Sequence, residues 1–268
     1  MSKVIFSKFH GTGNDFILID NREQKLVFDN PEVVSLMCDR RFGIGADGLI
    51  MLEESGSFDF RMVYFNADGY PGSMCGNGGR CITAFASRLG LVQGEAAFEA
   101  SDGLHEAFIL SKADSQWNVS LRMNDVTRVE MLDDAYILDT GSPHYVTLAD
   151  HLESLEVEKQ GRIIRNQPRF KEKGINVNFI SFLPEGTAIR TYERGVENET
   201  FSCGTGSVAA AIVTELKGKK HPAGPVSILT RGGNLKVKFK TDGDEYTDIW
   251  LEGPAVFVFE GAYNIPGK

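Results

Sequence analysis

SMCGNGGRC, residues 73–81, places a cysteine directly before a run of glycines. A second stretch, FSCGTGS at residues 201–207, repeats the order Cys-Gly-x-Gly. Each stretch leads into a segment with the pattern of a helix, residues 76–89 in the first case and 204–217 in the second. A glycine follows each segment and is typical of a helix end. We therefore expect each cysteine to stand at the start of a helix.

The second of these helices is apolar on nearly every side. Its sequence SVAAAIVTEL offers no polar face to water, so we expect it to be buried all round. The runs SKVIFSKFHG, NDFILIDN, GLIMLEES and FDFRMVYFN are short, rich in Val, Ile and Phe, and separated by turn residues, which predicts strands. A further helix is predicted from Asn30-Pro31 to Gly43. The pattern indicates a curved sheet around one central helix.

The same features recur at a constant offset along the chain. Cys203 follows Cys75 by 128 residues, and other pairs keep that spacing: Tyr64 and Tyr192, Gly13 and Gly141, and Arg41-Phe42 and Arg169-Phe170. Matches in one register without a gap indicate an internal repeat. We therefore predict an α+β fold with two pseudo-symmetric domains, each a mostly antiparallel sheet rolled around a central helix.

The composition limits the classes of partner. The 268 residues carry a formal net charge of −9, which argues against nucleic acid or an anionic membrane as a partner. The first residues show no long apolar stretch and no cleavage site, so we expect neither a signal peptide nor a membrane span there. We expect a cytoplasmic protein whose four cysteines are reduced thiols.

A cysteine at a helix start has a defined chemistry. The first N–H groups of a helix lack partners inside it and carry partial positive charge, so the thiolate is favoured there. Neighbouring glycines let a carboxylate approach those N–H groups. Two such helices, related by the repeat, would place two thiols on opposite faces of one ligand. That arrangement suits two-base proton transfer at a tetrahedral carbon.

Other interpretations of the cysteines and glycines fit less well. A zinc site needs clustered, closely spaced ligands, and a redox dithiol normally shows Cys-x-x-Cys; neither is present. The segment GIGADG, residues 43–48, matches a dinucleotide-binding expression but does not follow a strand and open a helix. Cys38 and Cys81 lie within helix patterns and are expected to be small buried residues.

The sequence resembles the diaminopimelate epimerases, a family of cofactor-independent amino-acid epimerases. The motifs that carry the resemblance are FHGTGNDF, FGIGADG, FNADGYPGSMCGNGGRC, GSPH, GINVNF and YERGVENETFSCGTGS. It extends along nearly the whole chain and implies an active site in the cleft between two domains. We place the domains at residues 1–123 plus 260–268, which carry Cys75, and at 124–259, which carry Cys203.

The resemblance implies a reaction and a catalytic pair. Members interconvert LL- and meso-diaminopimelate, on the route to lysine and peptidoglycan, without pyridoxal phosphate and without a metal. Cys75 and Cys203 would form the thiolate and thiol pair, which would titrate as a coupled unit. His144 and Glu193 would tune the two thiols. Exposed sheet in such domains favours a homodimer.

The resemblance also implies the residues that bind the substrate. N–H groups of the two first turns would hold the carboxylate on the reacting carbon: Gly76, Asn77, Gly204 and Thr205. These donors would matter most in the transition state, when negative charge spreads into that carboxylate. Glu193, helped by Asn14, would accept from the ammonium. The distal amino-acid end would be held by Arg194, Asn66 and Asn176, because the guanidinium fork can meet a carboxylate with two bonds.

Two positions depart from the pattern of the family. Ser142 stands where members commonly have asparagine, so its contact with the distal carboxylate would be lost or made through water. Gly48 stands where some members have glutamine, so only its backbone could contact a ligand. At the repeat offset Ser142 matches Asn14, and Gly48 matches Asn176. Asn66 likewise matches Arg194, and we expect each such pair to be structurally equivalent.

Two alternative functions remain open from the sequence. One is a proline or hydroxyproline racemase of the same fold, although Arg194 with Asn66 and Asn176 favours a ligand with a second charged end. The other is a thiol-based redox or ligand-binding protein on this scaffold. Incubation in deuterium oxide separates the two epimerase functions, because a diaminopimelate epimerase labels diaminopimelate whereas a proline racemase labels proline. A reversible disulfide tied to function would mark the redox protein.

Overall fold

The chain folds into two units, each with its own strands and its own central helix. The computed structural model describes residues 2–23, 26–72, 74–219 and 224–265. The first unit comprises Met1–Leu121 and Pro254–Lys268, and the second comprises Arg122–Gly253. The domain boundaries expected from the sequence, 1–123 with 260–268 and 124–259, stay a prediction.

The first unit is built mainly from antiparallel strands. In sheet order they are β1 (Ser2–Gly11), β2 (Asn14–Asp20), β3 (Gly48–Glu53), β4 (Phe60–Asn66), β5 (Glu95–Ala100), β6 (Gly103–Ala113) and β7 (Gln116–Arg122). The strand β16 (Glu245–Ile265) follows β7 in this order and also pairs with β1. Only the β2–β3 and β4–β5 pairs of this unit are parallel among the described registers. The strand order therefore closes on itself.

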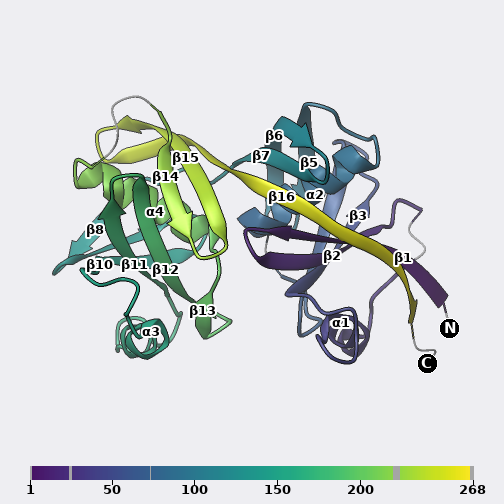
Figure 1. Cartoon of the computed structure of the whole chain (residues 1–268), viewed down its shortest axis with the longest axis horizontal. Coiled ribbons are helices and arrows are strands. Elements are labelled where there is room, and N and C mark those ends of the chain that lie inside the picture. The colour runs from purple at the N-terminus through teal and green to yellow at the C-terminus, as the bar shows by residue number, and fades with distance from the viewer. Residues whose placement is uncertain (1, 24–25, 73, 220–223, 266–268) are drawn as a thin grey trace. The chain divides into compact units, whose positions relative to one another are not determined.

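Helix α2 (Gly76–Arg88) lies among these strands (Figure 1). It begins as predicted with Cys75 as N-cap, and its C-cap Leu89 is followed by Gly90 in the left-handed region with φ 78°. Every residue from Gly76 to Ala86 is buried. Aromatic side chains complete the packing, since Phe85 meets Phe9 edge to face at 6.0 Å between centroids.

Helix α1 (Pro31–Cys38) lies outside the strands (Figure 1). Its start is as predicted, because the Asn30 side chain accepts from the Glu32 N–H. The predicted end at Gly43 is wrong. The chain leaves the helix at Asp39, whose backbone is extended and whose carboxylate accepts from the N–H groups of the next residues, Arg41 and Phe42, at 2.7 Å each. A local aspartate turn thus outcompetes a further helical turn.

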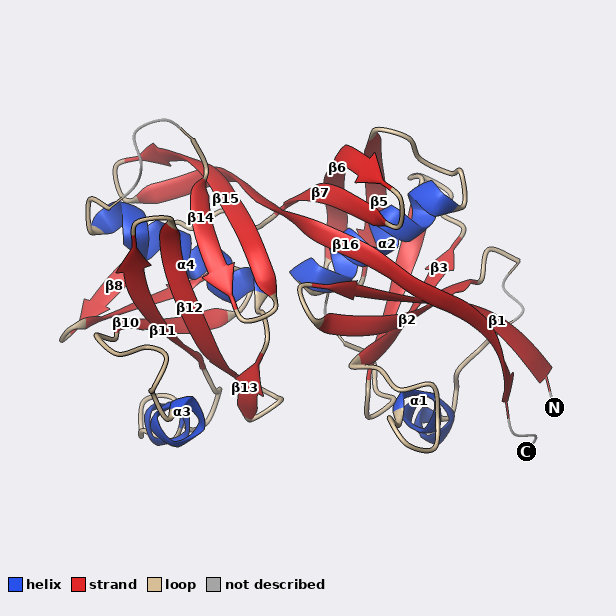
Figure 2. Cartoon of the chain, viewed as in Figure 1, coloured by secondary structure: helices blue, strands red, loops and turns tan. Residues whose placement is uncertain are grey.

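The second unit repeats this arrangement. Its strands in sheet order are β8 (Val129–Leu132), β9 (Ala135–Asp139), β10 (Pro143–Leu148), β11 (Asn176–Leu183), β12 (Gly186–Glu193), β14 (Val226–Thr230), β15 (Gly233–Asp242) and the first part of β16, with β13 (Asn198–Thr200) beside β12. Helix α4 (Gly204–Leu216) lies among the strands and helix α3 (Val157–Arg165) outside them (Figure 2). Strands β14 and β15 form an antiparallel hairpin at the Gly232-Gly233 turn.

The two units share ladder register as well as element order. Phe16 of β2 pairs with Gly48 of the parallel strand β3, and at the repeat offset His144 of β10 pairs with Asn176 of β11. The glycines of the preceding turns match too, because Gly13 has φ 86° and Gly141 has φ 97°. The predicted α+β class, with two similar halves of sheet and central helix, is confirmed.

One predicted equivalence is wrong by a single residue. In the first unit Asn66 is opposite Gly48. In the second, the antiparallel register of β11 and β12 brings Asn176 level with Glu193, not with Arg194. The second unit has one residue more between the strand end and its cysteine, which restores the constant offset afterwards. Asn66 is therefore equivalent to Glu193.

The same one-residue difference in strand register means that Tyr64 and Tyr192 are not equivalent. Tyr64 is opposite Ile50, whereas Tyr192 is opposite Val177. Because successive side chains of a strand point to opposite faces, a one-residue shift sends the two rings to different sides. Tyr192 packs on helix α3, where a Cβ on Gly161 would lie 2.4 Å from the Tyr192 Cβ. The tyrosine match at the repeat offset is a coincidence of sequence.

Candidate active site

Both candidate thiols cap the helix that follows them. The Cys75 sulfur accepts from the Gly78 N–H at 3.2 Å, and the Cys203 sulfur accepts from the Gly206 N–H at 3.4 Å. Both cysteines have the extended backbone of an N-cap residue. Cys75 is half-buried, and Cys203 is 8% exposed. Each sulfur thus lies at the positive end of a central helix, where negative charge is favoured.

The surroundings of the two sulfurs differ. A Cβ on Gly78 would meet the Cys75 sulfur, the Ile50 side chain and the Met62 side chain at 3.2–3.3 Å. A Cβ on Gly206 would instead lie 2.6 Å from the Asn178 amide oxygen. The first turn of α2 therefore packs against apolar side chains and the first turn of α4 against an amide, although the two cysteines occupy the same position before their helices.

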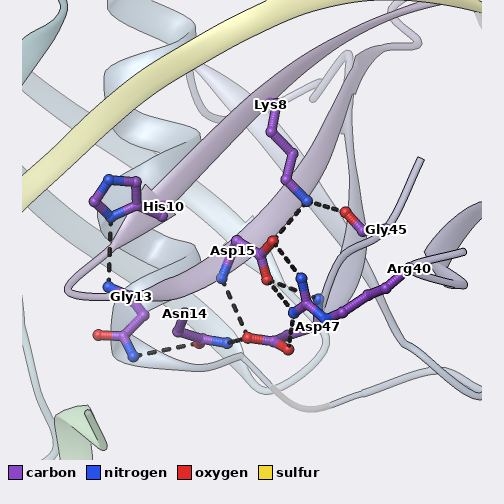
Figure 3. Close-up of polar contacts among 9 residues, drawn as sticks. Lys8, His10, Gly13, Asn14, Asp15, Arg40, Gly45 and Asp47 are labelled. Atoms are coloured by element: carbon purple, nitrogen blue, oxygen red, sulfur yellow. Dashed lines mark hydrogen bonds and ion pairs between the residues drawn. The ribbon is translucent and has the colours of Figure 1, made fainter. Parts of the chain in front are cut away.

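A network of polar side chains supports the start of α2 in the first unit (Figure 3). The Asn77 amide donates to the Asn14 amide oxygen at 3.2 Å, and Asn14 donates to Asp47 at 2.8 Å. Arg40 donates to both Asp15 and Asp47 at 2.6 Å. The amide of Asn14 is therefore held from two sides, which fixes its orientation.

A lysine completes this network from strand β1 (Figure 3). The Lys8 ammonium lies 2.8 Å from the Asp15 carboxylate and also donates to the Gly45 carbonyl oxygen. Burial alone would raise the pKa of Asp15, but hydrogen bonds and charge from Arg40 and Lys8 outweigh it and lower that pKa to about 2. Asp15 is consequently ionised over the whole physiological range.

The pKa of Asp15 predicts a pH-dependent stability. The pKa of Asp15 is lower in the folded protein than in the unfolded chain. Its contribution to the free energy of unfolding is therefore present at neutral pH and is lost as the pH falls from about 4 towards 2. We expect Asp15→Asn to lower the free energy of unfolding at pH 7 by about 1–2 kcal/mol, after allowance for screening by water. The difference from wild type should shrink towards pH 2.5. Urea unfolding at both pH values measures it.

A matched variant controls this measurement. Asp114 is exposed in a turn and has a positive φ, which asparagine tolerates. Asp114→Asn should therefore unfold like wild type at both pH values. A stability difference for Asp15→Asn that stays constant between pH 7 and pH 2.5 would contradict the assignment.

Gly48 is glycine because its neighbours fill the place of a side chain. A Cβ there would lie 2.5 Å from the Tyr64 ring and 2.7 Å from the Phe65 carbonyl oxygen. The Phe65 oxygen belongs to the adjacent strand backbone and cannot move aside cheaply. The expected contact of a ligand with Gly48 is thus restricted to its backbone, and that contact stays a prediction.

This crowding predicts a large difference between two glycine substitutions. Gly48→Ala should lower the free energy of unfolding by about 2–3 kcal/mol, the usual effect of overpacking. Gly94→Ala is the control, because a Cβ on Gly94 meets nothing within 4 Å. Thermal unfolding of the two variants side by side tests the contrast. Equal melting temperatures would show that β3 and β4 accommodate the methyl group.

In the second unit three predicted residues form one polar cluster. The Asn176 amide donates to the Ser142 hydroxyl at 2.9 Å, and its oxygen accepts from the Arg194 N–H at 2.9 Å. The Arg194 guanidinium donates to the same Ser142 hydroxyl at 3.2 Å and to the Lys173 carbonyl at 3.3 Å. Ser142 therefore orients the arginine directly, a function that the sequence did not suggest.

The remaining predicted residues of this unit are Glu193, Gly204 and Thr205. Glu193 accepts from the Thr200 hydroxyl at 2.7 Å. The Thr205 hydroxyl lies 3.4 Å from the Cys203 sulfur, and its carbonyl accepts from Thr140 at 3.0 Å. Gly204 is the first residue of the helix. Of these residues, Thr205 lies next to the second thiol.

His144 is buried next to Asn178 of the adjacent strand. Burial, with a smaller effect of the Arg194 charge, lowers its pKa to about 3, and the hydrogen bond with Asn178 opposes the shift. His144 is therefore neutral at physiological pH.

Sequence reasoning assigned no function to several residues that hold the site. The aspartates of the Figure 3 network lie in the quoted motifs FHGTGNDF and FGIGADG, and Asn178 lies in GINVNF. Arg80, in CGNGGRC, is 0% exposed and donates to the Gly76 carbonyl at 3.1 Å and to the Asn77 amide oxygen at 2.9 Å. A charged residue one position before a predicted buried cysteine was the available signal.

The two cysteines outside the candidate catalytic pair lie in the interior. Cys38 and Cys81 are buried as expected. Burial raises the pKa of Cys38 to about 12 and raises that of Cys81 well above its usual range. Both residues are therefore inert packing groups.

Neither a metal cluster nor a membrane-spanning helix is found in the described part of the chain. No group of three His, Cys, Asp or Glu residues there is arranged to hold a metal ion. Likewise, none of the helices described is long and apolar enough to cross a membrane. A surface groove of about 720 Å³ lies along α3, but none of the predicted site residues lines it.

Within each unit, several of the predicted site residues contact one another. In the first unit Asn14 contacts Asn77, and Gly48 is paired with Asn66 across the strands that precede Cys75. In the second, the Ser142, Asn176 and Arg194 cluster lies at the ends of the strands that precede Cys203. The catalytic and binding roles of these residues stay predictions.

Known proteins match this chain in sequence along nearly its whole length. The family model described as diaminopimelate epimerase matches residues 6–129 and 136–258. A diaminopimelate epimerase from Flavobacterium psychrophilum is 47% identical over 94% of this chain and 97% of its own length. One from Chlorobaculum tepidum is 42% identical over 95% of this chain and 99% of its own length.

Solved structures share the fold at low identity. A Bacillus anthracis phenazine biosynthesis protein of the PhzF family has a TM-score of 0.77 at 14% identity, covering 99% of this chain and 100% of that one. A hydroxyproline epimerase from Agrobacterium vitis, with bound trans-4-hydroxy-L-proline, has a TM-score of 0.69 at 14% identity, covering 97% and 92%. The family model and the curated relatives, unlike these structures, match in sequence along nearly the whole chain. The chain belongs to the diaminopimelate epimerase family.

Proposed function

We propose that this protein interconverts LL- and meso-diaminopimelate in the cytoplasm, using the Cys75 and Cys203 thiols as its two acid–base groups. The observation that carries the proposal is the pair of N-cap cysteines. Each sulfur accepts from an N–H of the first turn of a central helix, in two units of the same strand order. Because negative charge is favoured at such a position, either sulfur is suited to exist as a thiolate.

Proton transfer at the α-carbon then needs no cofactor. The thiolate of one cysteine removes the α-proton, and the thiol of the other delivers a proton to the opposite face. The substrate carboxylate accepts from N–H groups of the first turns, at Gly76 and Asn77 in one unit and Gly204 and Thr205 in the other. These donors stabilise the charge that spreads from carbon to carboxylate in the transition state.

The distal end of the substrate is assigned to the second polar cluster. Ser142 and Asn176 hold the Arg194 side chain and its backbone, respectively. An oriented guanidinium suits a carboxylate, which it can meet with two parallel bonds. Glu193 would accept from the substrate ammonium, with Asn14 and Asn66 contributing from the first unit. This need for a second charged end favours diaminopimelate over proline.

Isotope exchange in deuterium oxide tests the proposal. Incubation with LL-diaminopimelate should yield the meso form with deuterium at one α-carbon, as measured by mass spectrometry and chiral chromatography. Proline and hydroxyproline, under the same conditions, should stay unlabelled. Labelling of proline with none of diaminopimelate would establish the racemase alternative. A protein that labels neither substrate but cycles between dithiol and disulfide would establish the redox alternative.

The remaining expectations are part of the same proposal. We infer a homodimer, to be measured by sedimentation velocity, and a reaction that chelators leave unchanged. Removing every metal by dialysis against EDTA should not alter the rate, because no step of the scheme involves a Lewis acid. A rate that falls and is restored by one added metal would overturn this part of the proposal.

A further inference from the structure

Three buried polar side chains lie next to one another on adjacent strands of the second unit. His144 of β10 and Asn178 of β11 are 0% exposed, and Thr191 of β12 is 3% exposed. The Asn178 amide nitrogen is 3.0 Å from the His144 Nδ1, and the Asn178 oxygen accepts from the Thr191 hydroxyl at 3.0 Å. The same oxygen lies under Gly206, in the first turn of the helix that Cys203 caps. The network therefore reaches the first turn of the helix that Cys203 caps.

The orientation of the Asn178 amide is fixed by a backbone group. Its nitrogen is 3.1 Å from the Tyr145 carbonyl oxygen, which can only accept. The group that faces Tyr145 must therefore be the NH₂, and the same NH₂ faces the His144 Nδ1. Thr191 confirms this orientation from the other side, because its hydroxyl donates to the amide oxygen.

The tautomer of His144 follows from this orientation. Since the Asn178 NH₂ donates to Nδ1, that nitrogen must be the unprotonated acceptor of a neutral ring. The proton is then on Nε2. Nε2 is fully buried, and no group in the described residues forms a hydrogen bond with it. A buried N–H donor without an acceptor is costly and therefore rare.

We propose that Asn178 is a positioning residue that holds His144 as a neutral Nε2–H donor. In this state the open nitrogen of His144 cannot take a proton from Cys203. It can only donate a hydrogen bond, and we assign the Cys203 thiolate as its acceptor once that charge has formed. The assignment of the acceptor rests on the proposed function, whereas the tautomer does not.

The first unit has other residues at the strand positions that correspond to His144, Asn178 and Thr191. Phe16 takes the place of His144 and Ile50 the place of Asn178. Tyr64, opposite Ile50, takes the place of Thr191, which is opposite Asn178. Phe16 and Ile50 are apolar, so they cannot form the hydrogen bonds that His144 and Asn178 form. The first turns of the two central helices therefore stand over different residues.

Nitrogen-15 NMR of the histidines tests the inference in the absence of substrate. In the wild-type protein, His144 should show a protonated Nε2 and an unprotonated Nδ1, unchanged between pH 6 and pH 8. In Asn178→Asp the carboxylate is an acceptor, so the Nδ1 should become protonated. In Asn178→Leu, which removes the donor, the single tautomer should give way to a mixture.

Activity supplies a second readout. With LL-diaminopimelate, kcat/KM of Asn178→Asp should fall about tenfold or more, the usual effect of losing a hydrogen bond to a charged group. The control is Asn166→Asp, which makes the same chemical change at an exposed position of this unit. It should leave both the His144 spectrum and the rate unchanged.

The outcomes separate the inference from the proposed function. A wild-type His144 with a protonated Nδ1 would overturn the inference, and this measurement needs no variant to fold. A tautomer that survives in both Asn178 variants would overturn it as well. If the tautomer is as expected but diaminopimelate is not epimerised, the proposed function fails while the positioning role of Asn178 stands.

Discussion

Replacing either Cys75 or Cys203 with alanine is expected to abolish the interconversion of LL- and meso-diaminopimelate, with a loss in kcat/KM of about 10⁴-fold or more. The reason is that each thiol acts on one face of the α-carbon. Without it, the carbanion on that face has no proton donor, or the α-proton on that face has no base. A coupled assay or chiral chromatography measures the loss.

The two variants should differ in isotope exchange. A single remaining thiol can still remove a proton from the stereoisomer whose α-hydrogen faces it and return a deuteron to the same face. Each variant should therefore label one stereoisomer without inverting it, and the two variants should label opposite ones. This result would assign Cys75 and Cys203 to their faces, which neither the sequence nor the fold of one unit decides.

The other two cysteines provide matched controls. Cys38→Ala and Cys81→Ala alter thiols that are buried in packing. Each should cost about 1–2 kcal/mol of stability through lost volume and leave turnover near the wild-type rate. Normal turnover by Cys75→Ala or Cys203→Ala would refute the two-base scheme. Equal losses in all four variants would show that the assay reports folding and not chemistry.

Local sequence signals predicted the most useful part of the site. Each cysteine precedes glycines and a helix pattern, and N-cap geometry depends on only a few neighbouring residues. The constant offset then related the two cysteines without any knowledge of contacts. For the same reason the starts of α2 and α4 and the glycines after them agree with the structure.

Strand register lies beyond such local signals. The matching of Tyr64 with Tyr192 assumed that a constant sequence offset implies the same strand face. A compensated difference in connection length breaks that assumption, and alternation then reverses the face. The position of Asn66 relative to Glu193 depends on hydrogen bonds to another strand, so a single sequence does not encode it in readable form.

Polar networks between distant segments are equally hard to foresee. Asp15 and Asp47 meet Arg40 across a parallel strand pair, and each would pass for a turn or surface residue in isolation. Their effect on Asn14 exists only once the strands are paired. The quoted motifs FHGTGNDF and FGIGADG thus marked the right segments, while the contacts between them depend on the fold.

Arg80 provides the second large effect, a loss of stability on Arg80→Leu of roughly 3 kcal/mol or more. Its guanidinium is fully buried and, besides its contacts in the first turn of α2, donates to the Thr12 hydroxyl at 3.4 Å and to the Pro254 carbonyl at 3.5 Å. Burial lowers the pKa of Arg80 to about 10, so it stays charged at neutral pH. Leucine would leave several buried acceptors without their donor. Arg80→Lys should lose less, because the ammonium keeps the charge and some of these bonds.

Arg88, in the same helix, is the matched control for this experiment. It is exposed and pairs with Glu260 at 3.0 Å on the surface, so Arg88→Leu should change the free energy of unfolding by less than about 1 kcal/mol. Urea unfolding of the three arginine variants gives the ranking. Arg80 also holds the Gly76 carbonyl and the Asn77 amide beside Cys75, so kcat/KM of Arg80→Lys should fall under conditions in which it is folded. If Arg80→Leu proved as stable as Arg88→Leu, the buried guanidinium would not be what fixes the first turn of α2 to the turn after β1 and to β16.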